Sequence, residues 1–142
     1  MMKDIADLIG RICLSTIFFW EAYDSIAFYD STQRTMTNYG ITWNQDFLLL
    51  GAISILILGA FFVLVGYRAA TGAFLILLYW VPVTFIVYSF WNDPVSERRL
   101  QSILFMKNIA IIGGLLIMMA NGAGKYSIKR MIAASRPPKP RW

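Results

Sequence analysis

Two uncharged runs decide the fold of this chain: residues 47–67, FLLLGAISILILGAFFVLVGY, and residues 69–92, AATGAFLILLYWVPVTFIVYSFWN. A helix needs roughly 20 consecutive apolar residues to cross the hydrocarbon core of a bilayer, which is about 30 Å thick. Both runs are long enough, and neither has the regularly spaced polar residues of a surface helix or a half-buried strand. Each run therefore predicts one transmembrane helix.

The segments on either side of these runs are also apolar, although they carry some charge. Residues 5–29 contain four charged side chains, and residues 103–120 contain one, Lys107. We expect both segments to cross the membrane, so that the chain is an all-α membrane protein built as a four-transmembrane-helix bundle. The expected helices cover residues 5–29, 47–66, 70–91 and 102–120.

The basic residues predict the orientation of this bundle. An even number of crossings puts both termini and the short 67–69 turn on one side of the membrane. Nine basic residues belong to that side: Lys3, Arg11, Arg68, Lys125, Lys129, Arg130, Arg136, Lys139 and Arg141. The other side has three, Arg34, Arg98 and Arg99. Basic residues accumulate in the cytoplasm, so we expect a multi-pass protein of the cell inner (cytoplasmic) membrane with both termini cytoplasmic.

The same reasoning divides the chain into two parts. Residues 1–125 are expected to form the transmembrane domain, and residues 126–142 a basic, proline-containing cytoplasmic tail that is extended or disordered from Arg136 onward. The net charge of +5 is then explained by topology and by contact with anionic headgroups of membrane lipids, without nucleic acid. A protein partner for the tail is the alternative.

Between the helices, two polar segments are expected to be loops on the outer side, residues 30–46 and 92–101. Pro82 lies inside the third expected helix, where it removes one backbone donor and should kink the helix.

Residue usage excludes several kinds of redox centre. The chain has no histidine, so the usual axial ligand of a b-type haem and the commonest ligand of zinc, copper and non-haem iron is missing. Cys13 is the single cysteine, which excludes an intrachain disulfide and an iron–sulfur cluster. We therefore expect no metal site and no intrinsic cofactor. An electron-transfer role would need a partner's cofactor or a diffusible quinone.

The charged residues inside the expected helices are the first candidates for a functional site. Such groups are costly in a membrane, so they usually face the bundle interior and pair. Glu21 lies roughly 10 Å below the outer end of its helix, and Lys107 roughly 7 Å below the start of the last helix. Their depths match, so we predict an intramembrane ion pair or ligand site of Glu21 and Lys107. The alternative is that Lys107 extends to the interface and Glu21 meets water.

Three further observations extend this candidate site. Asn108 follows Lys107 and could also bind a ligand oxygen. Arg11, nearer the cytoplasm, either joins the intramembrane charges or reaches the headgroups. Helical spacing predicts that one face of each of these helices points into the bundle. That face carries residues 10, 14, 17 and 21 in the first helix, and residues 103, 107, 110, 114, 118 and 121 in the last.

Aromatic residues suggest a second candidate site. Tyr79, Trp80 and Tyr88 could wall a pocket for a ring-shaped ligand such as a quinone head. Plain core packing, with Tyr88 in an aromatic belt at the interface, is the alternative.

The last helix and the residues after it resemble a known family. Residues 105–116, FMKNIAIIGGLL, and residues 122–128, GAGKYSI, are similar to the C-terminal signature of the DoxX family of small four-helix membrane proteins. Arg11 and the segment 66–70, GYRAA, resemble family elements too. The chain departs from the family pattern at Lys129, where an acidic residue is common, and at residues 21–24, EAYD, where a glycine and a basic residue are usual.

The resemblance implies a role linked to membrane oxidoreductases, because some family members are named for a subunit of a quinone-linked thiosulfate oxidoreductase. Our first hypothesis is a non-catalytic accessory subunit that works with other membrane or extracytoplasmic protein subunits. A second is a quinone-reactive oxidoreductase subunit, with Glu21 as proton acceptor and Lys107 or Asn108 on a quinone oxygen. A third is a small transporter or a lipid-handling protein. The catalytic residues, if the chain is an enzyme, stay unassigned.

Overall fold

The fold was taken from a computed structural model, which describes residues 2–124 and 126–135. The elements of this part of the chain are helices: α1 (Met2–Ala27), α2 (Tyr29–Asn38), α3 (Gln45–Val65), α4 (Ala69–Val87), the 3₁₀ turn η1 (Phe90–Asn92), α5 (Val95–Asn121) and α6 (Ile128–Ala134). The chain is therefore all-helical over the residues described.

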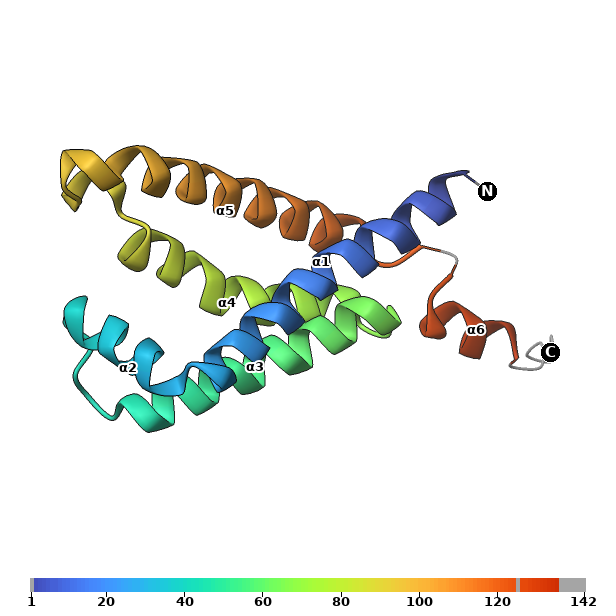
Figure 1. The fold of residues 1–142 in the computed structure, drawn as a ribbon. Coiled ribbons are helices and arrows are strands. Elements are labelled where there is room, and N and C mark those ends of the chain that lie inside the picture. Colours follow the sequence, from blue (N-terminus) through green and yellow to red (C-terminus); the bar gives the residue numbers. More distant parts are fainter. Residues whose placement is uncertain (1, 125, 136–142) are drawn as a thin grey trace.

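The long helices form an up-and-down arrangement (Figure 1). Helix α3 packs against both α1 and α4, and α4 also packs against α5. The N-terminus, the α3–α4 turn and α6 lie at one end of the molecule, whereas α2 and η1 lie at the other. Helices α1 and α5 approach each other toward the α6 end and diverge toward the α2 end. This divergence leaves α2 beside the open end of the bundle.

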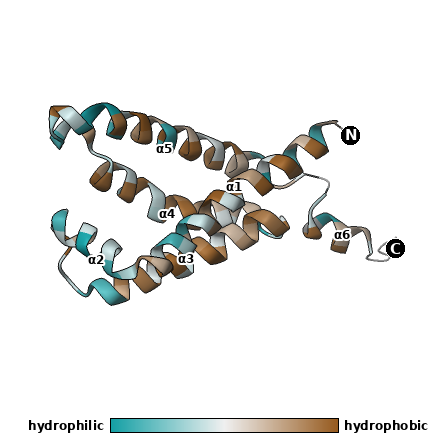
Figure 2. Cartoon of the chain, viewed as in Figure 1, coloured by the Kyte–Doolittle hydropathy of each residue, from teal (hydrophilic) through white to brown (hydrophobic). Residues whose placement is uncertain are grey.

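Three helical segments of the described chain are long and apolar enough to cross a membrane: Gln45–Val65, Ala69–Asn92 and Val95–Asn121. In Figure 2 the ribbons of these helices are mostly brown, the colour of hydrophobic residues, whereas that of α2 is paler and teal. Large apolar side chains such as Leu58, Phe74 and Ile117 are exposed along them, as expected where lipid takes the place of water. Helix α1 is long enough, with 26 residues, but carries more charge than these three. Its crossing stays a prediction.

The closest helix contact in the core involves two glycines. A Cβ atom added at Gly59 of α3 would lie 2.6 Å from Cγ1 of Ile76 on α4, and one added at Gly72 would lie 2.7 Å from the backbone oxygen of Gly59. Small residues let helix backbones approach this closely, which is the main source of packing energy in a membrane. The α3–α4 pair is thus closely packed, with Leu56, Val63 and Ile76 buried in it.

Both expected loops are shorter than the sequence indicated. Residues 30–46 were predicted to be a loop, and this is wrong, because Tyr29–Asn38 is helix α2. The segment 29–38 contains neither glycine nor proline, and three of its threonines donate their hydroxyls to the carbonyl four residues earlier. The loop expected at 92–101 is also wrong from residue 95, where α5 begins directly after Pro94. A proline with its fixed φ suits the start of a helix.

The inward face of α1 was predicted one position away from its most buried residues, and that of α5 was predicted only in part. The buried residues of α1 are Arg11, Ser15, Phe18, Ala22 and Ser25, and those of α5 are Phe105, Asn108, Leu115 and Met118. Residue 118 was predicted to face inward, whereas residues 10, 14, 17 and 21 of α1 and residues 107 and 114 of α5 each precede a buried residue by one position, a rotation of about 100°. Both helices are apolar over much of their circumference, so hydrophobic spacing says little about which side is inside. Helix α4 continues through Pro82 to Val87, so the proline does not end it.

Candidate functional site

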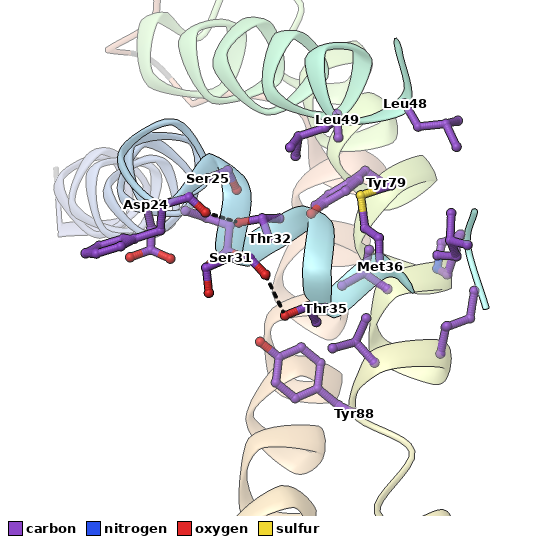
Figure 3. A pocket seen from close by; sticks show the side chains of 18 of the residues that line it. Asp24, Ser25, Ser31, Thr32, Thr35, Met36, Leu48, Leu49, Tyr79 and Tyr88 are labelled. Carbon is purple, nitrogen blue, oxygen red and sulfur yellow. Dashed lines mark hydrogen bonds between the residues drawn. The ribbon is translucent and has the colours of Figure 1, made fainter. Parts of the chain in front are cut away.

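A cavity of about 530 Å³ lies at the α2 end of the bundle, among α1, α2, α3 and α4 (Figure 3). Its lining residues are Glu21, Asp24, Ser25, Phe28, Ser31, Thr32, Thr35, Met36, Ile41, Leu48, Leu49, Ala52, Leu78, Tyr79, Pro82, Val83, Ile86, Val87 and Tyr88.

The cavity has two chemically different walls. Helices α3 and α4 supply aliphatic side chains such as Leu49 and Val83, together with the rings of Tyr79 and Tyr88. Helices α1 and α2 supply carboxylates and hydroxyls, which Figure 3 shows at Asp24, Ser25, Ser31, Thr32 and Thr35. A mostly apolar cavity with a few convergent polar groups is typical of a small-molecule site.

Helix α2 is held over the cavity by residues at the start of α3. The carboxylate of Asp46 accepts hydrogen bonds from the hydroxyl of Tyr29 at 2.9 Å and from Nε2 of Gln33 at 2.7 Å. Nε2 of Gln45 donates to Oγ1 of Thr37 at 2.8 Å and to the carbonyl oxygen of Ile41 at 2.6 Å. These bonds hold the polar wall of the cavity against the first turn of α3.

Two tyrosines have raised pKa values, Tyr29 in α2 and Tyr39 at its C-cap. The hydrogen bond to Asp46 is the main reason that the pKa of Tyr29 is raised above 10.0, with the negative charges of Asp46 and Asp30 acting in the same direction. Partial burial raises the pKa of Tyr39, and the charges of Asp93 and Glu97 add to this. The C-terminal end of α2 therefore lies within electrostatic reach of the start of α5.

Of the predicted ion pair, one partner lies at the cavity. Glu21 lines it and is half-buried, whereas Lys107 is exposed on α5 and is not a lining residue. No ion pair within 4.0 Å joins these two described side chains, although Lys107 is close enough to act electrostatically on Glu21. The direct Glu21–Lys107 pair stays a prediction.

The predicted aromatic pocket is divided in the same way. Tyr79 and Tyr88 line the cavity, but Trp80 faces the core, where it is 3% exposed and packs edge-on against Phe18 with ring centroids 5.1 Å apart. Asn108 is also buried outside the cavity, and its Nδ2 has no hydrogen-bond partner in the structure. The structure thus places Glu21, Tyr79 and Tyr88 in the lining of the cavity, whereas Trp80, Lys107 and Asn108 do not line it.

Arg11 lies at the opposite end of the bundle from this cavity. Its side chain is fully buried and paired with Asp7, so of the two alternatives for Arg11 the structure does not support the one in which it reaches the headgroups. Nε bonds to the carboxylate of Asp7 at 3.0 Å, Nη1 donates to the carbonyl oxygen of Leu64 at 2.9 Å, and Nη2 donates to the carbonyl oxygen of Tyr126. The same Asp7 oxygen accepts the N–H of Gly124 at 3.0 Å. Arg11 therefore ties α1, the end of α3 and the segment after α5 together.

The sequence of this chain matches a known protein family. The family model DoxX matches residues 6–89, more than half of the chain. The chain belongs to the DoxX family. The match includes Arg11 and the 66–70 turn, and it covers α1 to α4 with every residue that lines the cavity. The match ends before residues 105–116 of α5, which carry the sequence resemblance described above.

This DoxX protein is similar in sequence to two curated proteins. Inner membrane protein YqjF of Escherichia coli is 28% identical over 131 residues, which is 92% of this chain and 95% of that protein. Surfeit locus protein 4 homolog of Schizosaccharomyces pombe is 30% identical over 91 residues, which is 63% of this chain but 29% of that protein. No solved structure matches. Similarity to an inner membrane protein over almost its whole length agrees with the three apolar helices, so the chain is a multi-pass membrane protein.

Sequence reasoning missed the polar wall of this DoxX cavity. Ser31, Thr32 and Thr35 were assigned to a loop, so they were not considered as site residues. Their spacing of one, three and four residues would place them on adjoining faces of a helix, and that was the available signal. Among residues 2–124 and 126–135, no three His, Cys, Asp or Glu side chains gather as metal ligands. The chemistry available at the cavity is therefore that of carboxylates, hydroxyls, phenols and an apolar wall.

Proposed function

We propose that this DoxX-family protein binds a small amphipathic molecule in the cavity between α1, α2 and α4. The observation that carries the proposal is the cavity itself, about 530 Å³ in volume, with an aliphatic wall on one side and hydroxyls and carboxylates on the other. Ligand sites are typically about 300–1,000 Å³ and have this kind of lining. A molecule with an apolar body and a polar head would fill both halves.

We further propose that α1 is a fourth crossing and that both termini are cytoplasmic. Support comes from how α1 accommodates its charges: Arg11 is buried against Asp7 and two backbone carbonyls, and Glu21 faces the cavity. Paired or cavity-facing charges are the ones that a transmembrane helix tolerates. With this orientation the cavity lies in the outer half of the membrane.

The second candidate function is an accessory subunit of a larger, oxidoreductase-linked membrane complex. It is favoured by composition, because a chain with no histidine and one cysteine would depend on a partner for electron transfer. A quinone is one ligand that fits this hypothesis, since the phenols of Tyr79 and Tyr88 could donate to its ring oxygens. A transporter or lipid-handling protein would use the same cavity without redox chemistry.

The test is purification of the C-terminally tagged protein from its native membrane in mild detergent, followed by mass spectrometry of co-purifying small molecules and proteins. The variant Ala52→Phe fills the cavity, and Leu58→Phe places the same ring on the lipid-facing side of α3 as a control. We expect a small molecule that is retained by the wild type and by Leu58→Phe but lost from Ala52→Phe. Identical small molecules in all three samples would contradict ligand binding in this cavity.

The protein partners found in the same experiment decide the second candidate. A stoichiometric large partner, present also with Ala52→Phe, would support the accessory-subunit function. A protein that purifies alone from its native membrane would contradict it.

A further inference from the structure

The charges that line the cavity all have the same sign. Glu21 and Asp24 are acidic, and none of the described lining residues is a lysine or an arginine. These two residues are three positions apart on α1, so both carboxylates face the same region. The nearest cation that acts on Glu21 is Lys107, which is exposed on α5 outside the cavity. One ammonium beside two carboxylates leaves the site with an excess of negative charge.

The two threonine hydroxyls of α2 that line the cavity act as hydrogen-bond acceptors toward it. Thr32 donates its hydroxyl proton to the carbonyl oxygen of Phe28 at 3.0 Å, and Thr35 donates to that of Ser31 at 3.1 Å (Figure 3). A hydroxyl has one donor and two acceptor lone pairs, so each of these threonines has only lone pairs left for a ligand. The polar wall therefore presents acceptors to a ligand, in the form of carboxylates and threonine oxygens.

Aromatic rings stand beside these acceptors. Phe28, Tyr79 and Tyr88 line the cavity together with the hydroxyl-bearing residues of α2, and Figure 3 labels the two tyrosines. The face of an aromatic ring attracts cations electrostatically, most strongly where water is excluded. Carboxylates, oxygen lone pairs and ring faces all favour a positive ligand head.

We propose that the ligand of this cavity is an organic cation: an ammonium or phosphonium group near Glu21 and Asp24, flanked by Tyr79 and Tyr88, with an apolar body against Leu49, Pro82 and Val83. This inference rests on the proposed ligand-binding function and specifies its ligand class. An anion such as a phosphate would meet carboxylates on the polar wall, and a neutral acceptor such as a quinone would find donors in the phenols and serine hydroxyls but would leave the two carboxylates without a counter-charge.

Equilibrium dialysis of the purified full chain in nonionic detergent, with protein-free micelles as the blank, tests this ligand class. The three probes are tetraphenylphosphonium, its anionic isostere tetraphenylborate, and neutral triphenylphosphine oxide. We expect the protein to bind the cation in preference to the other two. Preferred binding of the neutral or anionic probe would overturn the inference but leave the ligand-binding function standing. No binding of any probe would count against both.

Charge-removing variants locate the cation. Glu21→Gln and Asp24→Asn together should weaken tetraphenylphosphonium binding by about fivefold or more, because each removes one partly exposed charge interaction. Glu97→Gln removes an exposed carboxylate of α5 that does not line the cavity, and should leave the dissociation constant unchanged. Lys107→Met should tighten cation binding, because it removes the competing charge near Glu21. Equal affinities of all these variants would overturn the inference.

Asp24→Asn alone guards against a folding artefact, because Asp24 is exposed at the cavity rim and its loss removes no buried contact. This single variant should weaken cation binding and leave the binding of triphenylphosphine oxide as it is in the wild type. If it weakens both probes equally, the effect is not one of charge and the inference fails.

Discussion

Nη1 of Arg11 donates a hydrogen bond of 2.9 Å to the carbonyl oxygen of Leu64, a residue 53 positions later in the sequence. Leu64 lies in the last turn of α3, where backbone carbonyls have no partner within the helix. The positive guanidinium also meets the negative end of the helix dipole at this place. One buried side chain therefore caps α3 and, through the carbonyl of Tyr126, holds the segment that leads to α6.

The first prediction concerns this buried arginine. Arg11→Met should lower the free energy of unfolding by about 3 kcal/mol or more, because it leaves Asp7 without its charge partner and two carbonyls without donors. Arg11→Lys should be nearly as destabilising, since a lysine cannot supply three donors in a planar fork. Thermal unfolding in detergent measures the loss. Arg99→Lys, at an exposed position of α5, is the control and should have little effect.

The second prediction concerns the glycine that makes room for Arg11. Gly66 has φ +72°, and a Cβ atom there would lie 2.5 Å from Nη1 of Arg11 and 2.7 Å from Cβ of Ser127. Gly40 also has a positive φ, +80°, with nothing within 4 Å of its added Cβ atom. Gly40→Ala should cost only the strain of a positive φ, about 1–2 kcal/mol. Gly66→Ala should cost clearly more, because it also displaces the arginine, and equal melting temperatures of the two variants would contradict this.

Arg11 shows what the sequence could and could not predict. The apolar runs predicted the helices that cross the membrane, because length and lack of charge decide whether a segment spans a bilayer. The fate of Arg11 depended on which carbonyls the ends of α3 and α5 would place beside it, and no local pattern records such a contact. The inward faces of α1 and α5 were predicted only in part for a related reason, since packing decides the orientation of helices that are apolar over much of their circumference.

The cavity was predictable only in part. Tyr79 and Tyr88 were identified from their residue type and depth, and Glu21 from the cost of burying a charge in a membrane. The hydroxyls of α2 were missed because a polar segment with few apolar residues indicates a loop. Helix α2 is stabilised by bonds from Gln33 and Tyr29 to Asp46, which lies in the first turn of α3.

The third prediction uses two glycines of α3. A Cβ atom at Gly59 would collide with Ile76 of α4 and lie 3.0 Å from the carbonyl oxygen of Gly72, whereas one at Gly51 would meet nothing within 4 Å. Gly59→Ala should therefore separate α3 from α4 and lower the melting temperature. Gly51→Ala should be neutral or stabilising by about 0.5–1 kcal/mol, because alanine is the better helix former. Melting curves of the two variants in detergent are the measurement. An equal loss of stability in both variants would contradict the prediction.

The fourth prediction is a pH dependence at α2. The hydrogen bond to Asp46 raises the pKa of Tyr29 above 10.0, so the folded protein favours the neutral phenol. The stability that this bond contributes is fully present below the unfolded pKa of about 10, and is lost as the pH rises through the higher folded pKa. The protein should thus loosen at α2 only in strongly alkaline solution.

Absorbance titration can isolate this phenol among the seven tyrosines by subtracting the curve of Tyr29→Phe. Asp46→Asn should move the Tyr29 transition to lower pH, because it removes both the strongest hydrogen bond and a negative charge. Asp30→Asn should move it less, since Asp30 acts by charge alone. The reverse order of these two effects would show that Asp46 does not hold Tyr29 in solution.

The fifth prediction tests the orientation of the bundle and the crossing of α1. Cys13 is the single cysteine, so a Cys13→Ala background accepts one new thiol at a time. Met2→Cys, Asn38→Cys and Ser135→Cys place this thiol at exposed positions at the start of α1, at the end of α2 and after α6. In right-side-out vesicles, a membrane-impermeant maleimide should label Asn38→Cys at once and the other two only after lysis. Matching labelling of Met2→Cys and Asn38→Cys would mean that α1 does not cross, while labelling of Ser135→Cys in intact vesicles would reverse the orientation.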